Sequence, residues 1–433
     1  MRNNTIKVLV PLAVLVTVLA FQSSALLPPA FAASTWYVAP SPAGTGNPGG
    51  SCSAPGFNTI SAAIAAASAG DTINVCTGTY TEQVTIPTSL TLTGVPYPHH
   101  SSLAPTIQAP TILTVGSPNI VTIESLSSQI TVTFQGFTVT GPGQGGCDSL
   151  NTGISVEYGV TAYILQNTIE HIRDQPLSGC VNGQGIFVSS NEPRTSTVPS
   201  GAITDATITD NTISDYQKAG IVVVGQGSMA TITGNTVTGV GPSTVTVQDG
   251  IVVRGGAVAT IKFNTVSGNE CNSTPTPQCG PDLINDEDSV GIALICAPTL
   301  QDSTPATTPE LTRSCAALAV ASGTVGSAAR GSGTVVTDNT VSGNDVGIGV
   351  YQDSGVTIDH NKVINNRYAG IALEDGTYTA SFNRVTGPGV VGIVAIATSL
   401  DTSVTLSGND IDHVTVSIEA DAESGLTATI LFS

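Results

Sequence analysis

Short segments of alternating apolar and polar residues recur along most of the chain. In residues 370–374, for example, Ile371 and Leu373 point to one side, whereas Ala372 and Glu374 point to the other, as in a half-buried strand. Turns separate these segments, and no helical pattern lies between them that would supply βαβ crossovers. The pattern therefore predicts an all-β protein made of short strands.

Two sequence markers recur together with these segments. The first is Asn followed two residues later by Ile or Val, and it begins at Asn167, Asn211, Asn235, Asn264, Asn339, Asn361, Asn383 and Asn409. The second is the dipeptide Gly-Ile, which begins at Gly153, Gly185, Gly220, Gly250, Gly291, Gly347, Gly370 and Gly392. The most regular stretch has successive Asn markers 22 residues apart, from 339 to 361 to 383. Such a period predicts a repeat architecture with one coil per repeat.

The asparagines suggest how each coil turns. Asn tolerates the left-handed α region, so an Asn between two strands can turn the chain sharply without Gly. Coils stacked about 4.8 Å apart would bring these amides together as a hydrogen-bonded ladder. The order strand, Asn corner, strand, loop, strand predicts a three-sheet parallel β-helix. An antiparallel sandwich is disfavoured, because hairpin turns such as Asn-Gly do not recur between the strands.

We expect residues 34–433 to form one β-helix domain. Residues 57–70 predict a short helix that caps the first coil, with Asn58 or Thr59 as its N-cap and Gly70 at its end. Residues 296–333, which are rich in Ser, Thr, Pro and Ala, are predicted to be a loop insertion. Other expansions flank the Gly-Ile segments, as if walling a groove over one sheet.

The two markers resemble the repeats of the pectin-lyase-like superfamily over about residues 57–425. The resemblance implies a right-handed helix with three parallel sheets. Residues 78–82 look like the Gly-x-Tyr-x-Glu entry segment of these proteins. The paired Asp and Gln motifs of the esterases do not follow it, so we expect this segment to be structural. The superfamily includes lyases, glycosidases, esterases, epimerases, phage tailspikes and non-catalytic surface proteins, so the fold leaves the function open.

The N-terminal residues 1–33 read as a signal peptide. Arg2 and Lys7 precede a short apolar run, and Ala30-Phe31-Ala32 provides an A-x-A cleavage site. We therefore expect a secreted protein with no membrane attachment after cleavage. The chain has 12 Lys and Arg against 31 Asp and Glu, a net charge of −19, which argues against nucleic acid as a partner.

The eight cysteines are typical of an exported disulfide-bonded protein. Sequence neighbours suggest the pairs Cys52–Cys76, Cys147–Cys180, Cys271–Cys279 and Cys296–Cys315. Cys147 and Cys180 stand at nearly the same place in successive coils, within disulfide reach across one coil step. That pair is the best supported of the four.

In the superfamily that the markers resemble, substrates usually lie along the outer face of one sheet. On the Gly-Ile strands of this chain, that face is mostly small or apolar, which counts against an ordinary lyase or hydrolase. Its larger or charged residues, which we take as candidate groove residues, are Glu157, Phe187, Tyr351 and Glu374.

One constellation on this face suggests chemistry. Asp249, Asp286 and Asp288 are on adjacent coils, where their carboxylates could hold Ca²⁺, and Arg254 is the candidate for the base role that an Arg has in pectate lyases. Asp353, Glu374 and Asp375 form a second carboxylate group on adjacent coils.

Two hypotheses follow. The first is a secreted, non-catalytic β-helix that binds a polysaccharide or cell-surface glycan, or serves as an interaction scaffold. The alternative is a Ca²⁺-dependent polysaccharide lyase or related carbohydrate enzyme. The sequence leaves open which glycan is bound and the oligomeric state.

Overall fold

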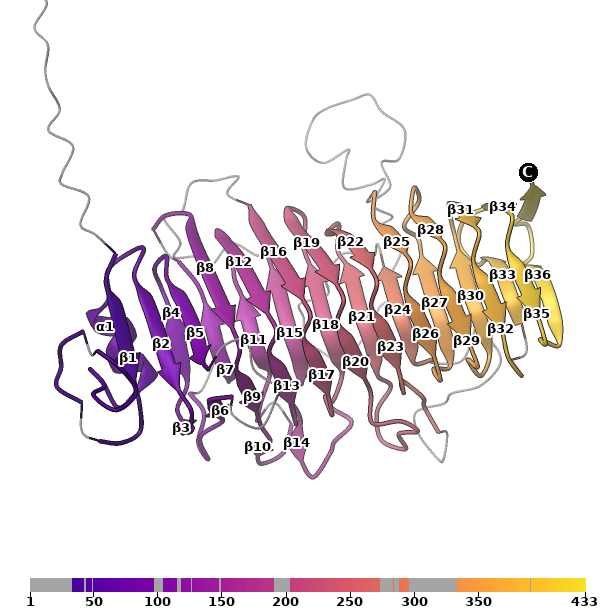
Figure 1. The fold of residues 1–433 in the computed structure, drawn as a ribbon. Coiled ribbons are helices and arrows are strands. Elements are labelled where there is room, and N and C mark those ends of the chain that lie inside the picture. Colours follow the sequence, from indigo (N-terminus) through magenta and orange to yellow (C-terminus); the bar gives the residue numbers. More distant parts are fainter. Residues whose placement is uncertain are drawn as a thin grey trace, which may run out of the picture. The chain divides into compact units, whose positions relative to one another are not determined.

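A computed structural model describes residues 33–433 except 43, 49, 97–103, 115–117, 126, 148, 191–202, 273–282, 284–287, 296–332 and 390. The predicted signal peptide over residues 1–33 therefore lies almost entirely outside the described residues, as does most of the predicted insertion over 296–333. Figure 1 shows the coils of the described residues stacked side by side from β1 to β36.

The strands form three parallel sheets, which confirms the predicted three-sheet parallel β-helix. Sheet 1 consists of β1 (Thr35–Val38), β2 (Thr72–Cys76), β5 (Thr91–Val95), β8 (Ile130–Gln135), β12 (Val160–Leu165), β16 (Thr204–Thr209), β19 (Ser228–Thr233), β22 (Val258–Lys262), β25 (Val335–Thr337), β28 (Thr357–Asp359), β31 (Thr377–Ser381), β34 (Thr402–Ser407) and β37 (Ala428–Phe432).

Sheet 2 follows the Asn corners and contains the shortest strands. It consists of β3 (Thr79–Thr81), β6 (Thr106–Gln108), β9 (Thr138–Thr140), β13 (Thr168–Glu170), β17 (Thr212–Ser214), β20 (Thr236–Thr238), β23 (Thr265–Ser267), β26 (Thr340–Ser342), β29 (Lys362–Ile364), β32 (Arg384–Thr386) and β35 (Asp410–Asp412).

Sheet 3 carries the Gly-Ile segments. It consists of β4 (Val84–Ile86), β7 (Asn119–Ile123), β11 (Thr152–Val156), β15 (Gln184–Ser189), β18 (Ala219–Val224), β21 (Asp249–Arg254), β24 (Val290–Ile295), β27 (Val346–Tyr351), β30 (Ala369–Glu374), β33 (Val391–Ala397) and β36 (Val416–Ala422). A separate pair, β10 (Gly143–Gln144) and β14 (Asp174–Gln175), joins two loops that leave sheet 2.

The core fills the space between the three sheets with aliphatic rows. Equivalent residues stack in register, so that Ile348 pairs with Ile371 and Ile371 pairs with Ile393, and all three are fully buried. The Gly of the Gly-Ile marker is required because the backbone of the next coil and a core side chain leave no room for a Cβ atom. A Cβ on Gly370 would lie 2.3 Å from Val385 Cγ1 and 2.6 Å from the Gly392 carbonyl oxygen.

The predicted Asn ladder is confirmed. Each ladder Asn donates its side-chain amide to the Oδ1 atom of the ladder Asn on the next coil, at 2.9–3.0 Å, from Asn167 through to Asn409. The backbone N–H of each donor residue is bonded to that same oxygen, as at Asn361 (3.0 Å). The ladder therefore fastens each coil to the next at the corner between sheets 1 and 2.

The conformation expected for these asparagines was wrong. The left-handed residue is the one before each Asn: Gln166, Asp210, Gly234, Phe263, Asp338, His360, Phe382 and Gly408, with φ between +52° and +68°. None of the eight ladder asparagines has positive φ. The preceding residue makes the turn, which frees the Asn side chain to point inward and bond along the stack.

A second Asn ladder was not predicted. At the end of sheet 2, Asn269 donates to Asn344 Oδ1 (2.9 Å), and Asn344 donates to Asn366 Oδ1 (3.0 Å). The fully buried Tyr216 donates its hydroxyl to Asn269 Oδ1 at 2.6 Å. This ladder strengthens the corner that leads from sheet 2 to sheet 3.

The capping helix is α1 (Ile60–Ala66), shorter than the predicted 57–70, and its C-cap is Ala67 rather than Gly70. Its N-cap is Thr59, whose hydroxyl accepts the Ala62 N–H at 3.3 Å. Glu82 also binds this end of the helix, accepting the N–H of Ile60 (2.8 Å) and of Ser61 (3.0 Å). The entry segment over residues 78–82 therefore serves the cap, as expected of a structural element.

Two of the predicted disulfides are confirmed. Cys52 bonds to Cys76 with the Cα atoms 5.7 Å apart, and Cys147 bonds to Cys180 with the Cα atoms 5.4 Å apart. Cys271 is also disulfide-bonded. The predicted partner Cys279 and the predicted pair Cys296–Cys315 lie outside the described residues.

Candidate functional site

The outer face of sheet 3 is the face on which a substrate groove was predicted. The strand register stacks its central outward row as Ser155, Phe187, Val222, Val252, Ala293, Gly349, Ala372 and Val394. The next outward row along the strands contains Ser189, Val224, Arg254, Ile295, Tyr351, Glu374 and Ile396. Of the four candidate groove residues, Phe187, Tyr351 and Glu374 lie in these rows, whereas Glu157 follows the end of β11.

The aliphatic part of this face is buried, contrary to the expectation of an open groove. Val222, Ala293 and Val394 are 3%, 1% and 1% exposed, and they belong to a second hydrophobic cluster outside the main core. Leu283, from the expansion that precedes β24, packs against this cluster. Rows of Val and Ala that face outward gain stability when they are covered, and Leu283 contributes to that cover.

The Tyr351 hydroxyl lies within electrostatic reach of several carboxylates. Burial raises the pKa of the Tyr351 hydroxyl, and the nearby carboxylates of Asp288, Glu374 and Asp249 raise it further. The ring lies back over Gly349, since a Cβ there would be 2.7 Å from the tyrosine oxygen. The structure thus joins two sets of residues that the sequence had suggested separately.

Asp249 and Arg254 stand at opposite ends of β21 and influence one another. Burial raises the pKa of Asp249, while Lys218, a hydrogen bond from the Val290 N–H (3.2 Å) and Arg254 lower it. The Arg254 side chain is exposed, but the protein atoms around it partly desolvate the guanidinium and lower its pKa, while Asp249 raises it. The Asp249 carboxylate thus lies within electrostatic reach of two cations and is bonded to the next strand.

A calcium ion was predicted at Asp249, Asp286 and Asp288. Asp286 lies outside the described residues. Within the described part of the chain, no three His, Cys, Asp or Glu side chains are grouped so that they could hold a metal. The calcium site therefore stays a prediction.

Glu374 and Asp375 anchor the segment that follows β33. The Thr398 hydroxyl donates to Glu374 Oε1 at 2.6 Å, and burial raises the pKa of Glu374. Asp375 accepts the N–H groups of Thr398 (2.8 Å), Ser399 (3.0 Å) and Leu400 (3.1 Å). Burial alone would raise the pKa of Asp375, but these backbone bonds lower it below its ordinary value. These two members of the predicted carboxylate group therefore have a structural role.

Glu157 and Phe187 are not part of the Tyr351 cluster. Glu157 follows β11, which stands three places from β21 in sheet 3. Its carboxylate accepts the Ser155 hydroxyl at 2.5 Å, and its pKa is raised by burial and, less strongly, by Glu124. Phe187 packs on the aliphatic cluster.

A charged contact that the sequence did not reveal lies just after two strands of sheet 2, β13 and β17. Arg173 Nε donates to both carboxylate oxygens of Asp215, at 2.8 and 2.9 Å, and His171 Nδ1 contacts the same carboxylate. His171 and Asp215 each stand four residues after a ladder Asn and have positive φ. That shared offset is the signal that would have brought them together.

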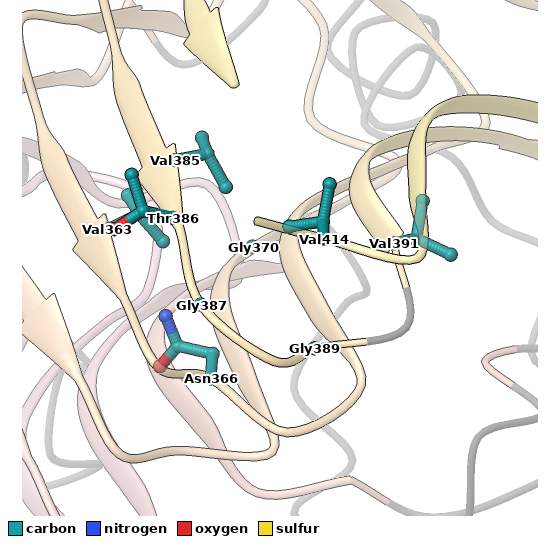
Figure 2. Close-up of a pocket in the computed structure, with 9 residues that line it drawn as sticks. All are labelled: Val363, Asn366, Gly370, Val385, Thr386, Gly387, Gly389, Val391 and Val414. Atoms are coloured by element: carbon teal, nitrogen blue, oxygen red, sulfur yellow. The ribbon is translucent and has the colours of Figure 1, made fainter. Parts of the chain in front are cut away.

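A small cavity lies beside the end of the second Asn ladder (Figure 2). Its volume is about 10 Å³, and Asn366, Gly370, Val385 and Val391 are among the residues that line it. This is room for about one water molecule, so the cavity is not a sugar site.

Comparison with known families agrees with this architecture. Residues 199–411 match the family model "Right handed beta helix region", and residues 43–203 match "Protein of unknown function (DUF1565)". The match to the β-helix family model and the three parallel sheets of the structure agree on a right-handed parallel β-helix fold, which is the fold that the resemblance to pectin-lyase-like repeats implied. No curated protein matches the chain. The described residues contain no helix with the length and hydrophobicity of a membrane span.

Several solved β-helix structures are similar to this one in fold. The mannuronan C-5 epimerase A-module of Azotobacter vinelandii is 13% identical, covers 86% of this chain and 92% of its own, and has a TM-score of 0.42. A periplasmic alginate epimerase is 14% identical, with coverages of 84% and 76% and a TM-score of 0.42. A pectate lyase is 14% identical, with coverages of 92% and 77% and a TM-score of 0.34. At these values the likeness carries no information about activity.

Proposed function

We propose that this protein is an exported β-helix that binds glycans without cleaving them. The observation that carries the proposal is the burial of the aliphatic rows on the outer face of sheet 3, where Val222, Val252 and Ala372 are 3%, 4% and 2% exposed. A groove that cleaves a polysaccharide must admit several sugar rings to an open, polar face. The covered face of sheet 3 does not offer that access.

The ionisable groups on this face also support a non-catalytic reading. A general base must accept a proton near the working pH, but the raised pKa of Tyr351 keeps its hydroxyl protonated. Asp375 is occupied by backbone N–H groups, and Glu374 is bonded to Thr398. These side chains hold the loop after β33 in place.

Export is part of the proposal. The two disulfides are typical of an oxidising compartment, and residues 1–33 have the pattern of a cleaved signal. Expression of the full chain in its own host, followed by N-terminal sequencing of the protein in the medium, tests this. We expect a mature N-terminus near residue 34, and an uncleaved protein that stays with the cells would contradict export.

A glycan array combined with a product assay tests the function. The purified protein should bind at least one polysaccharide class and should release neither reducing ends nor unsaturated uronates from pectic, alginate or glycosaminoglycan substrates. The variants Arg254→Ala and Glu374→Gln should bind as the parent does. Turnover that these substitutions abolish would overturn the non-catalytic assignment.

One observation favours the alternative of a calcium-dependent polysaccharide lyase or related enzyme. Asp249, Asp288 and Glu374 all act on the same Tyr351 hydroxyl, and Arg254 is close enough to Asp249 to shift its pKa. Arg254 and these carboxylates could take part in proton transfer if a substrate reached them, but the three carboxylates are not grouped as a metal site by themselves, so a bound cation would need further ligands. Product formation that a chelator stops and added Ca²⁺ restores would establish this alternative.

A further inference from the structure

Exposed aromatic side chains occupy one edge of the β-helix. Phe263 and Phe382 are 58% and 56% exposed, and the His360 side chain is 56% exposed. All three stand at the left-handed corner position immediately before a ladder Asn, after strands β22, β28 and β31. We call Phe263, His360 and Phe382 the aromatic corner row. Asp338 occupies the one corner between Phe263 and His360.

The fold does not need aromatic residues at this position. The backbone φ angles of Phe263, His360 and Phe382 are +57°, +53° and +52°, a region that is unfavourable for bulky side chains. Gly occupies the same corner at Gly234 and Gly408 with no such cost. A strained backbone and an exposed side chain do not stabilise the fold, so stability does not explain the aromatic residues here. Such positions point to a function.

The rings of this row are ordered along the stack of coils. The ring centroids of His360 and Phe382 are 5.0 Å apart, with the planes at 29°. Phe382 also lies against the next corner, since a Cβ on Gly408 would be 2.6 Å from its Cε1 atom. From Phe263 to Phe382 there are three coil steps, or about 14 Å at about 4.8 Å per step. The row is therefore longer than a single pyranose ring.

The charges around the row balance, although the chain as a whole has a net charge of −19. The charged residues at the corners from 263 to 408, or within two residues of them, are Lys262, Lys362, Arg384, Asp338, Asp359 and Asp410. Three cations and three carboxylates therefore stand at or next to these corners, and Arg384 Nε lies 3.7 Å from Asp410 Oδ2. Such a surface neither repels nor specially attracts an anion, which makes it complementary to an uncharged ligand.

From these observations we infer that the aromatic corner row binds an uncharged glycan, a site that deepens and rests on the proposed glycan-binding function. The apolar C–H faces of the sugars pack against Phe263, His360 and Phe382. Their hydroxyl groups donate to the carboxylates of Asp338 and Asp359, both of which border the row. The glycan lies along the edge, parallel to the direction in which the coils stack.

The test uses Phe263→Gly and Phe382→Gly in one double variant, because Gly is the native residue at two equivalent corners. The probes are cellohexaose, which is uncharged, and an oligogalacturonate hexamer, which is anionic, both measured by calorimetry. We expect the parent to prefer cellohexaose and the double variant to bind it at least about 10-fold more weakly. The thermal midpoint of the variant should stay unchanged or rise, since the strain is removed.

Asp210→Gly is the matched control, because Asp210 has the same corner conformation but no aromatic ring, and this variant should bind as the parent does. Equal affinity of parent and double variant would overturn the inference, as would a loss of binding accompanied by a fall in the thermal midpoint, which would mark a structural role. A parent that binds other glycans on the array but not cellohexaose refutes this site alone. A parent that binds no glycan refutes the proposed function with it.

Discussion

Asn361 places two donors on one acceptor of the next coil. Its backbone N–H and its side-chain amide both bond to Asn383 Oδ1, each at 3.0 Å. Asn361 in turn accepts the same pair of bonds from Asn339, at 3.1 and 3.0 Å. Each ladder residue is thus a partner for both neighbouring coils, and its loss leaves unpaired groups on both sides.

Replacing Asn361 with Ala should destabilise the protein by about 2–4 kcal/mol, because buried donors of Asn339 and the Val336 carbonyl lose their partner. Thermal or denaturant unfolding measures this. Asn409→Ala is the control at the end of the ladder, where the residue is half-buried and has no ladder partner beyond it. It should cost clearly less, and equal losses would mean that the ladder contributes nothing cooperative.

Gly370→Ala should destabilise the protein by about 1–3 kcal/mol through overpacking, since the new Cβ would lie 2.3 Å from Val385 Cγ1. Gly50→Ala provides the comparison, because nothing lies within 4 Å of a Cβ at that position. Unfolding midpoints of the two variants should separate. A Gly370→Ala protein as stable as the parent would show that the coils can move apart at this marker.

Stability should fall as the pH rises through the range in which Asp345 ionises. This carboxyl group is fully buried, and burial raises its pKa to about 6, although the N–H groups of Cys271 and Ser289 bond to it. Because the folded state holds this proton more tightly than the unfolded state, the favourable contribution is complete below about pH 4 and is lost by pH 7. The loss amounts to about 3 kcal/mol.

Unfolding free energies of the parent and of Asp345→Asn, measured from pH 4 to pH 7, check this value. The difference between the two proteins should change with pH, because only the parent titrates at this position. Other carboxylates contribute equally to both and cancel. Parallel curves would show that Asp345 stays ionised, held by Arg367, whose Nη1 atom lies 3.7 Å from Asp345 Oδ1.

The double substitution Cys147→Ser and Cys180→Ser should cost about 2–4 kcal/mol, because the bridge constrains 33 residues of the unfolded chain. Differential scanning calorimetry measures the effect. Adding reductant to the parent should lower its stability at least as far, since that treatment also opens Cys52–Cys76. If the variant melts with the parent, the two loops are held by the β10–β14 pair without the bridge.

The repeat itself was readable from the sequence, because the physics of stacking acts on identical positions. Asn361 and Asn383 recur at the interval of one coil, and so do Gly347 and Gly370, so the ladder and the face register followed directly. Cys147 and Cys180 were placed by the same reasoning. Features that repeat once per coil are therefore accessible to sequence analysis.

Other features depend on contacts that the repeat does not encode. The second Asn ladder is an exception, since Asn269, Asn344 and Asn366 each stand five residues after a ladder Asn, an offset that the sequence analysis did not use. The burial of sheet 3 was missed because an outward Val222 has the same strand pattern whether the sheet is covered or not. Asp249, Asp288 and Glu374 all influence Tyr351. That proximity could not be predicted from the strand register alone, because Asp288 lies in a loop before β24 and not on a strand.

At the corner between sheets 1 and 2, two adjacent residues have different roles. The ladder Asn hydrogen-bonds one coil to the next, and the residue before it faces outward. The Asn bonds along the stack to the ladder Asn of the next coil, whereas the residue before it carries Gln, Asp, Gly, Phe or His in different coils. The residue at each outward corner can therefore be substituted in one coil at a time without a change in core packing. In protein design, the same eight positions could present new side chains in a line, with one coil step between neighbours.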